Sequence, residues 1–103
     1  LTKQLPKKTQ LLPNYPNPFN PETWIPFELH QNTNVSLTIS DLKGNQVRRI
    51  DLGYTLLGKY TSHNKAIHWD GKNNNGEKVA SGTYFYAIHT NNYTQTKKMV
   101  ILK

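Results

Sequence analysis

Cysteine is absent from this chain of 103 residues. A disulfide framework, a thiolate metal site and a cysteine nucleophile are therefore excluded, and the fold has to rest on packing and backbone pairing alone. The absence does not identify the cellular compartment, so a secreted location has to be inferred from other features.

Long apolar runs are also absent. The longest, residues 99–102, is far shorter than the roughly 20 residues of a membrane helix, and the first residues lack the apolar block of a signal peptide. We therefore expect no transmembrane segment. Because the chain starts at Leu1 without an initiator methionine and ends abruptly at Lys103, we expect it to be a piece of a longer protein.

Acidic residues are few: six Asp and Glu stand against thirteen Lys and Arg, which gives a formal net charge of +7. This excess favours acidic partners through long-range fields that salt weakens. A nucleic-acid site combines such charges with exposed aromatic side chains, whereas the aromatic residues here occupy the expected core positions of strands. We predict a solvated basic face and no nucleic-acid partner. An acidic glycan or lipopolysaccharide is a hypothesis motivated by the charge.

A helical repeat is missing, and a period of two dominates from Trp24 onward, as in half-buried strands. Every second residue is apolar over residues 25–29 and 35–39, whereas residues 83–90 are apolar on both faces and are expected to form a central strand. Residues 46–52 alternate imperfectly, which indicates either a bulge or a misplaced strand boundary. The chain has room for one core. We predict an all-β fold, an immunoglobulin-like antiparallel β-sandwich of about seven strands.

Proline is concentrated at the start, where residues 1–23 hold five of the six prolines. Proline removes a backbone donor and keeps its predecessor out of the helical region. We assign residues 1–10 to a basic linker from an upstream region and residues 11–103 to the sandwich domain. Residues 11–21 are too apolar for a linker, so we expect them to lie against the sandwich. An Asn between prolines is suited to bonding free backbone groups there and to capping a sheet edge.

Three motifs occur in order along the chain. They are NYPNPFNP at residues 14–21, DLKGNQV at residues 41–47, and WDG at residues 69–71 followed by NGEKVASGTYFY at residues 75–86 and KKMV at residues 97–100. In this order and spacing they resemble the type A C-terminal sorting domain of type IX secretion and the similar immunoglobulin-like domain of flagellar hook-capping proteins. The resemblance covers residues 12–103. The chain differs from the usual pattern in its charge and in a long insertion between Leu52 and Lys65.

The resemblance implies a sandwich at the C-terminus of a large exported bacterial enzyme or adhesin, secreted or held at the cell surface and read by an outer-membrane secretion machine. Its partners would be the upstream domains of the parent protein and that machinery. The residues assigned to this sorting motif, or to its structural support, are Asn17, Pro18, Gly44, Val47, Trp69, Asp70, Gly71, Gly76, Gly82, Tyr84 and Lys98.

Several of these residues have a structural explanation of their own. Trp69 at a strand end predicts a buried indole, and Asp70 predicts a turn whose carboxylate accepts backbone donors. Gly82 precedes the expected central strand, where a close approach or a positive φ would exclude any Cβ.

No catalytic, cofactor or metal site is predicted. The oxygen donors of residues 70–77 do not fit the spacing of a calcium loop, because the final bidentate acid would fall on Gly82. The four histidines lack a spacing that a single strand would bring onto one metal, and His68 alternates outward from Ile67. Neither a glycine elbow around a serine nor a phosphate-binding loop is present. We therefore predict a module that is not an enzyme.

Trp24 leaves two interpretations open. It shares a face with Glu28, opposite the apolar face of its strand, and is either an exposed anchor for an interface or packed beneath the proline-rich segment. The alternative function is accordingly a carbohydrate- or protein-binding β-sandwich module, or a spacer, appended to a secreted enzyme or adhesin.

Overall fold

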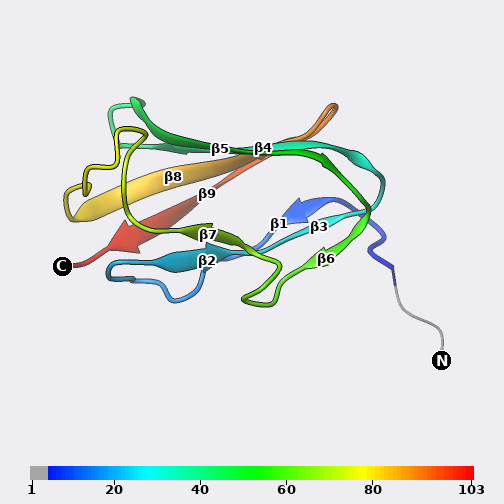
Figure 1. Cartoon of the computed structure of the whole chain (residues 1–103), viewed down its shortest axis with the longest axis horizontal. Coiled ribbons are helices and arrows are strands. Elements are labelled where there is room, and N and C mark those ends of the chain that lie inside the picture. The colour runs from blue at the N-terminus through cyan, green and yellow to red at the C-terminus, as the bar shows by residue number, and fades with distance from the viewer. Residues whose placement is uncertain (1–4) are drawn as a thin grey trace.

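The computed structural model describes residues 5–103. In these residues the strands form two layers of antiparallel sheet (Figure 1). The first layer is a four-stranded sheet in the order β5-β4-β8-β9. Its strands are β4 (Thr33–Ser40), β5 (Gln46–Thr55), β8 (Gly82–His89) and β9 (Thr94–Ile101). β8 pairs with both β4 and β9. The predicted central strand is therefore confirmed.

The second layer consists of two smaller sheets, with the orders β1-β3-β6 and β2-β7. Its strands are β1 (Gln10–Leu11), β2 (Thr23–Ile25), β3 (Phe27–Leu29), β6 (Gly58–Tyr60) and β7 (Ile67–Trp69). The predicted immunoglobulin-like sandwich is confirmed, with nine strands in the described residues where about seven were expected. The additional strands are the short segments of this second layer.

Pro26 divides what the alternating pattern presents as one strand. It lies between β2 and β3, and a proline cannot donate a hydrogen bond to a neighbouring strand. The alternation nevertheless survives the division, because Ile25, Phe27 and Leu29 are all fully buried. The sequence pattern therefore identified the buried face correctly but not the separation into two sheets.

The core lies between the layers and receives side chains from both. The largest fully buried side chains are Trp69, Tyr86, Phe19, Phe27, Leu11, Ile25, Leu29, Leu37, Ile39, Ile88, Met99 and Ile101. Leu11 and Phe19 belong to the segment that was expected to lie against the sandwich, and both are buried. That expectation is confirmed.

The expected irregularity in residues 46–52 is also confirmed. The pairing of β5 with β4 shifts between Ile39 and Ser40 and again between Val35 and Ser36. Each shift accommodates one extra residue on β5, as a β-bulge does, and it explains why the alternation is interrupted.

The ordered fold begins before residue 11. Thr9 is buried, its hydroxyl is 2.7 Å from Nδ1 of His30, and Gln10 already pairs with Glu28. Residues 1–4 of the predicted linker lie outside the described residues. In the part of the chain that is described, no helix has the length and apolarity needed to cross a membrane.

Candidate functional site

The proline segment, residues 14–21, runs beside the end of β9, which is an edge strand of the four-stranded sheet. The backbone N–H of Phe19 donates to the carbonyl of Val100 at 3.0 Å, and the N–H of Leu102 donates to the carbonyl of Phe19 at 3.0 Å. Between them, the side-chain Oδ1 of Asn17 accepts the N–H of Val100 at 2.9 Å. The segment therefore covers the free edge at the end of β9, with an Asn side chain supplying an acceptor beside the prolines.

A buried tyrosine holds the start of the proline segment. The Tyr86 hydroxyl accepts the backbone N–H of Asn14 at 3.0 Å and donates to the carbonyl of Leu12 at 2.9 Å. Burial raises the pKa of the Tyr86 phenol above its ordinary value, although the hydrogen bond from Asn14 acts in the opposite direction. The hydroxyl therefore remains protonated at neutral pH and keeps its role as a donor.

The WDG motif forms the turn after β7. The indole of Trp69 is fully buried, and its Nε1 donates to the carbonyl of Lys72 at 2.9 Å. The Asp70 carboxylate accepts the backbone N–H of Lys72 at 3.0 Å and pairs with Arg48 at 3.2 Å. Both local expectations for this turn agree with the structure, and the ion pair additionally ties the turn to β5.

Gly71 brings the WDG turn into contact with the proline segment. Its φ is +77°, and a Cβ at this position would lie 2.5 Å from the carbonyl oxygen of Pro21. Gly82 differs, because its φ is +151° but a Cβ would meet nothing within 4 Å. Of the two reasons expected to require glycine at position 82, only the positive φ therefore applies.

The remaining motif residues lie at the same end of the sandwich. Asp41, Leu42, Lys43 and Asn45 of the turn that holds Gly44 line a shallow surface hollow together with Ser81, Gly82, Thr83 and Tyr84. The loop that contains Gly76 also reaches β5, where the N–H of Asn74 donates to the carbonyl of Val47 at 3.0 Å. Lys98 is exposed on β9. We call this end, formed by the proline segment, residues 41–47, residues 69–84 and the end of β9, the motif end.

A second shallow hollow at the motif end has both basic and acidic groups at its rim. Lys72, Lys78 and Lys103 line it together with Glu22, Asp70, Pro21 and Ile101. Asp70 is paired with Arg48, and the carboxylate of Glu22 lies 2.8 Å from Nε2 of His68. Among the described residues, no three His, Cys, Asp or Glu side chains are grouped so as to hold a metal ion. The arrangement is suited to recognition through shape and charge.

Trp24 is half-buried and lies in an aromatic group on the second layer. The His63 ring stacks on it at a centroid distance of 4.1 Å, and the His68 ring lies 5.2 Å away at a tilt of 44°. Tyr15, from the proline segment, stacks at 6.4 Å and exchanges two backbone hydrogen bonds with Trp24. Both interpretations of Trp24 therefore apply in part, because the Trp24 side chain packs against the proline segment and also remains partly exposed.

The other two histidines lie apart from this group. His30 contacts Thr9, and Nε2 of His89 lies 2.9 Å from the Thr38 hydroxyl on the four-stranded sheet. His68 is in β7 and His89 is in β8, so the two histidines belong to different layers.

A family model described as the FlgD Ig-like domain matches residues 23–93. The chain belongs to this family. The match begins at β2 and ends before β9, so the Ig-like domain extends beyond it at both ends through the proline segment and the last strand.

Three solved structures share the fold of this Ig-like domain. One is the crystal structure of dimeric latent PorU from Porphyromonas gingivalis. The match has 22% sequence identity and a TM-score of 0.69, and it covers 91% of this chain and 9% of PorU. PorZ, an essential surface component of the type IX secretion system of the same bacterium, is 18% identical with a TM-score of 0.58, over 92% of this chain and 11% of PorZ. FlgD from P. aeruginosa is 30% identical with a TM-score of 0.54, over 71% of this chain and 54% of FlgD.

The Ig-like domain thus spans less than two thirds of each of these three chains. At their level of identity, the likenesses to PorU and PorZ show the fold alone. No curated protein matches the chain.

Two residues that contact the predicted site residues of this Ig-like domain were not predicted from the sequence. One is Arg48, which pairs with Asp70 across 22 residues of sequence, and the other is His63, which covers part of the Trp24 ring. Neither has a local signal, because strand periodicity indicates the face on which a side chain lies but not its partner in another strand.

Proposed function

We propose that this Ig-like domain is a non-catalytic module of a larger exported bacterial protein, and that its motif end serves as the signal for secretion, sorting and surface attachment. The observation that carries the proposal is that all three motifs, which are dispersed over residues 14–100, contribute residues to one end of the sandwich. The similarity to a small part of PorU and PorZ supports the view that the domain is one module of a longer chain.

The motif end has the rigidity that a recognition signal requires, because a surface that is already ordered loses less conformational entropy on binding. Its proline segment is held by backbone bonds to β9 and by the close approach of Gly71 to Pro21. We propose the outer-membrane secretion machinery as the partner that reads this surface, with the upstream domains of the parent protein as neighbours. The exposed Lys78 and Lys98 fit an acidic glycan or lipopolysaccharide as an attachment partner.

A reporter fusion tests the proposal. Residues 11–103 are fused to the C-terminus of a reporter carrying a signal peptide, in a bacterium with a type IX secretion system. We expect the reporter in the medium or on the cell surface, and in the periplasm of a strain that lacks the secretion machine. A reporter that stays in the periplasm of both strains refutes the sorting function.

A charge reversal then locates the signal. Lys98→Glu changes an exposed residue of the motif end, whereas the matched variant Lys8→Glu makes the same change of charge outside the motif end. We expect Lys98→Glu to reduce the exported fraction and Lys8→Glu to leave it unchanged in a fusion that includes residues 5–103. Equal export of both variants would show that the signal does not involve this face of the motif end.

The aromatic group around Trp24 favours a second candidate function, which is binding of a carbohydrate or a protein. Trp24 retains partial exposure, but His63 stacks on its ring at 4.1 Å. A sugar would therefore need the rest of the indole or displacement of His63. A glycan array with Trp24→Ala as the control tests this function, since specific binding must be lost in the variant.

A further inference from the structure

A second surface lies at the end of the sandwich away from the motif end, on the insertion between Leu52 and Lys65. Exposed large apolar side chains gather in this region: Leu5, Tyr54, Leu56 and Leu57 have 55%, 67%, 60% and 38% of their surface accessible. Such a concentration of exposed apolar surface is typical of an interaction site. The motif end does not account for it.

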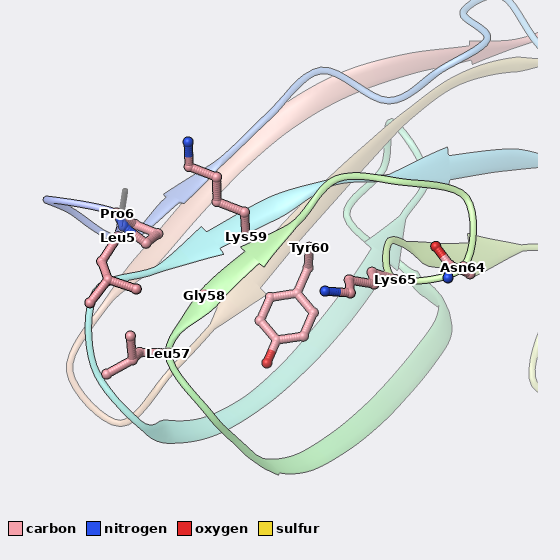
Figure 2. Close-up of a pocket in the computed structure, with 8 residues that line it drawn as sticks. All are labelled: Leu5, Pro6, Leu57, Gly58, Lys59, Tyr60, Asn64 and Lys65. Carbon is pink, nitrogen blue, oxygen red and sulfur yellow. The ribbon is translucent and has the colours of Figure 1, made fainter. Parts of the chain in front are cut away.

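The insertion forms one side of a groove, which Figure 2 shows. The groove has a volume of about 540 Å³, and its lining includes Leu5, Leu57, Lys59, Tyr60 and Lys65. The Tyr60 ring is fixed from two directions, by stacking on Phe27 at 4.8 Å and by a hydrogen bond of 2.6 Å from its hydroxyl to the carbonyl of Leu56. The apolar wall of the groove is therefore preorganised.

The groove lies beside an open edge of a sheet. β6 is the last strand in the order β1-β3-β6, and in the described residues it pairs with β3 alone. An edge strand offers unpaired N–H and C=O groups to another extended chain. β6 is only three residues long, so pairing with it contributes few hydrogen bonds, and affinity must also come from the groove side chains.

The charged side chains of the groove have one sign. Lys59 and Lys65 are both exposed, and neither takes part in an ion pair within the described residues. The residues that line the groove include no Asp or Glu. An occupant with carboxylates would therefore gain attraction here without first breaking an existing ion pair.

We propose that this groove binds an extended acidic segment of a partner protein, which adds a strand to the open edge of β6. Lys59 and Tyr60 are successive residues of β6 and point to opposite sides of it (Figure 2), so a paired segment with alternating side chains places its apolar residues on the Tyr60 side and its carboxylates on the Lys59 side. Lys65 adds positive charge to the lining of the groove. The concave shape and the open edge favour a peptide over a membrane surface, which would be met by a convex apolar face.

Titration of the purified, isotope-labelled chain with a short peptide of alternating glutamate and valine tests the proposal by NMR. We expect amide shifts confined to residues 57–60 and 64–65, and weaker binding at higher salt because the charges are exposed. A peptide with lysine in place of glutamate must not bind. A glutamate-valine peptide that is N-methylated at every residue must bind more weakly, because it cannot donate strand hydrogen bonds from either edge.

Charge reversals connect the binding to the groove. The double variant Lys59→Glu and Lys65→Glu is expected to weaken the peptide at least about fivefold, whereas Lys43→Glu, a single reversal in a distant exposed turn, should change it less than about twofold. A second control, the pair Lys43→Glu and Lys78→Glu, matches the net charge of the double variant and should retain binding. Dispersed amide spectra confirm that each variant is folded.

Each of the following results would overturn the proposal: no shifts in residues 57–60, binding of the lysine peptide, equal weakening by both double variants, or full binding of the N-methylated peptide. Binding to anionic phosphatidylglycerol vesicles without binding to the peptide would identify a membrane contact instead, and would also overturn it. The titration uses the isolated chain and no secretion machine, so its outcome is independent of the proposed sorting function.

Discussion

Substituting Gly71 by alanine tests whether the WDG turn and the proline segment are joined through the backbone. Two separate costs arise at this position. The first is the left-handed conformation at φ +77°, and the second is the contact of 2.5 Å between the new Cβ and the carbonyl oxygen of Pro21. The atom in the way belongs to the backbone, so a side-chain rotation does not relieve the contact.

The expected loss of stability follows from these two costs. A left-handed backbone costs an ordinary residue about 1–2 kcal/mol. Moving a backbone segment to admit an extra methyl group in a packed site costs about 1–3 kcal/mol more. Gly71→Ala should therefore lower the free energy of unfolding by about 2–5 kcal/mol, a large share of the roughly 5–15 kcal/mol of a typical domain.

Gly76→Ala is the matched control. Its φ is +81°, close to that of Gly71, but a Cβ there meets nothing within 4 Å. Only the conformational cost of about 1–2 kcal/mol applies. The difference between the two variants therefore isolates the contact with Pro21.

Urea denaturation followed by tryptophan fluorescence measures both variants, because Trp69 is buried in the core. We expect the midpoint of Gly71→Ala to lie clearly below that of Gly76→Ala at an unchanged denaturant slope, which is the condition for comparing stabilities. Equal midpoints would refute the reasoning, since they would show that the two segments are not in obligatory contact.

Three further predictions concern the same end of the molecule. Trp69→Ala should cost about 3–5 kcal/mol in urea denaturation through the loss of a fully buried aromatic side chain, and a loss below about 1 kcal/mol would contradict its place in the core. Asn17→Ala removes the acceptor for the N–H of Val100, so hydrogen exchange at Val100 should become faster while a central amide such as that of Tyr86 keeps its rate; unchanged exchange at Val100 would contradict the edge cap. The backbone N–H of Asn45 holds the pKa of the Asp41 carboxyl below its ordinary value. The ionised carboxylate therefore stabilises the folded turn at pH values above the pKa that Asp41 has in the unfolded chain. This contribution is lost as the pH falls through the lower pKa of the folded state. An NMR titration should accordingly show an Asp41 midpoint below that of an ordinary exposed aspartate, and an unshifted or raised midpoint would contradict the hydrogen-bonded turn.

Much of the fold was predictable because it depends on local patterns. The alternation of apolar residues identified the buried faces of β3 and β4, and the two apolar faces of residues 83–90 identified the central strand. The imperfect alternation of residues 46–52 indicated the bulges in β5. In each case the pleat of a strand converts a period of two in the sequence into one buried face, so no knowledge of the partner strand is needed.

The sequence by itself thus determined the all-β class, the buried faces and the motif residues, but only the tertiary structure showed that the motifs contribute residues to one end. Asn17 bonds to Val100 across 83 residues of sequence, and the contact of Gly71 with Pro21 and the stacking of His63 on Trp24 are equally non-local. The groove beside β6 likewise combines residues 57–65 with Leu5 from the start of the chain, which is distant in the sequence. Periodicity specifies the face on which a side chain lies, whereas such pairs depend on strand order and loop closure, which a local pattern does not contain.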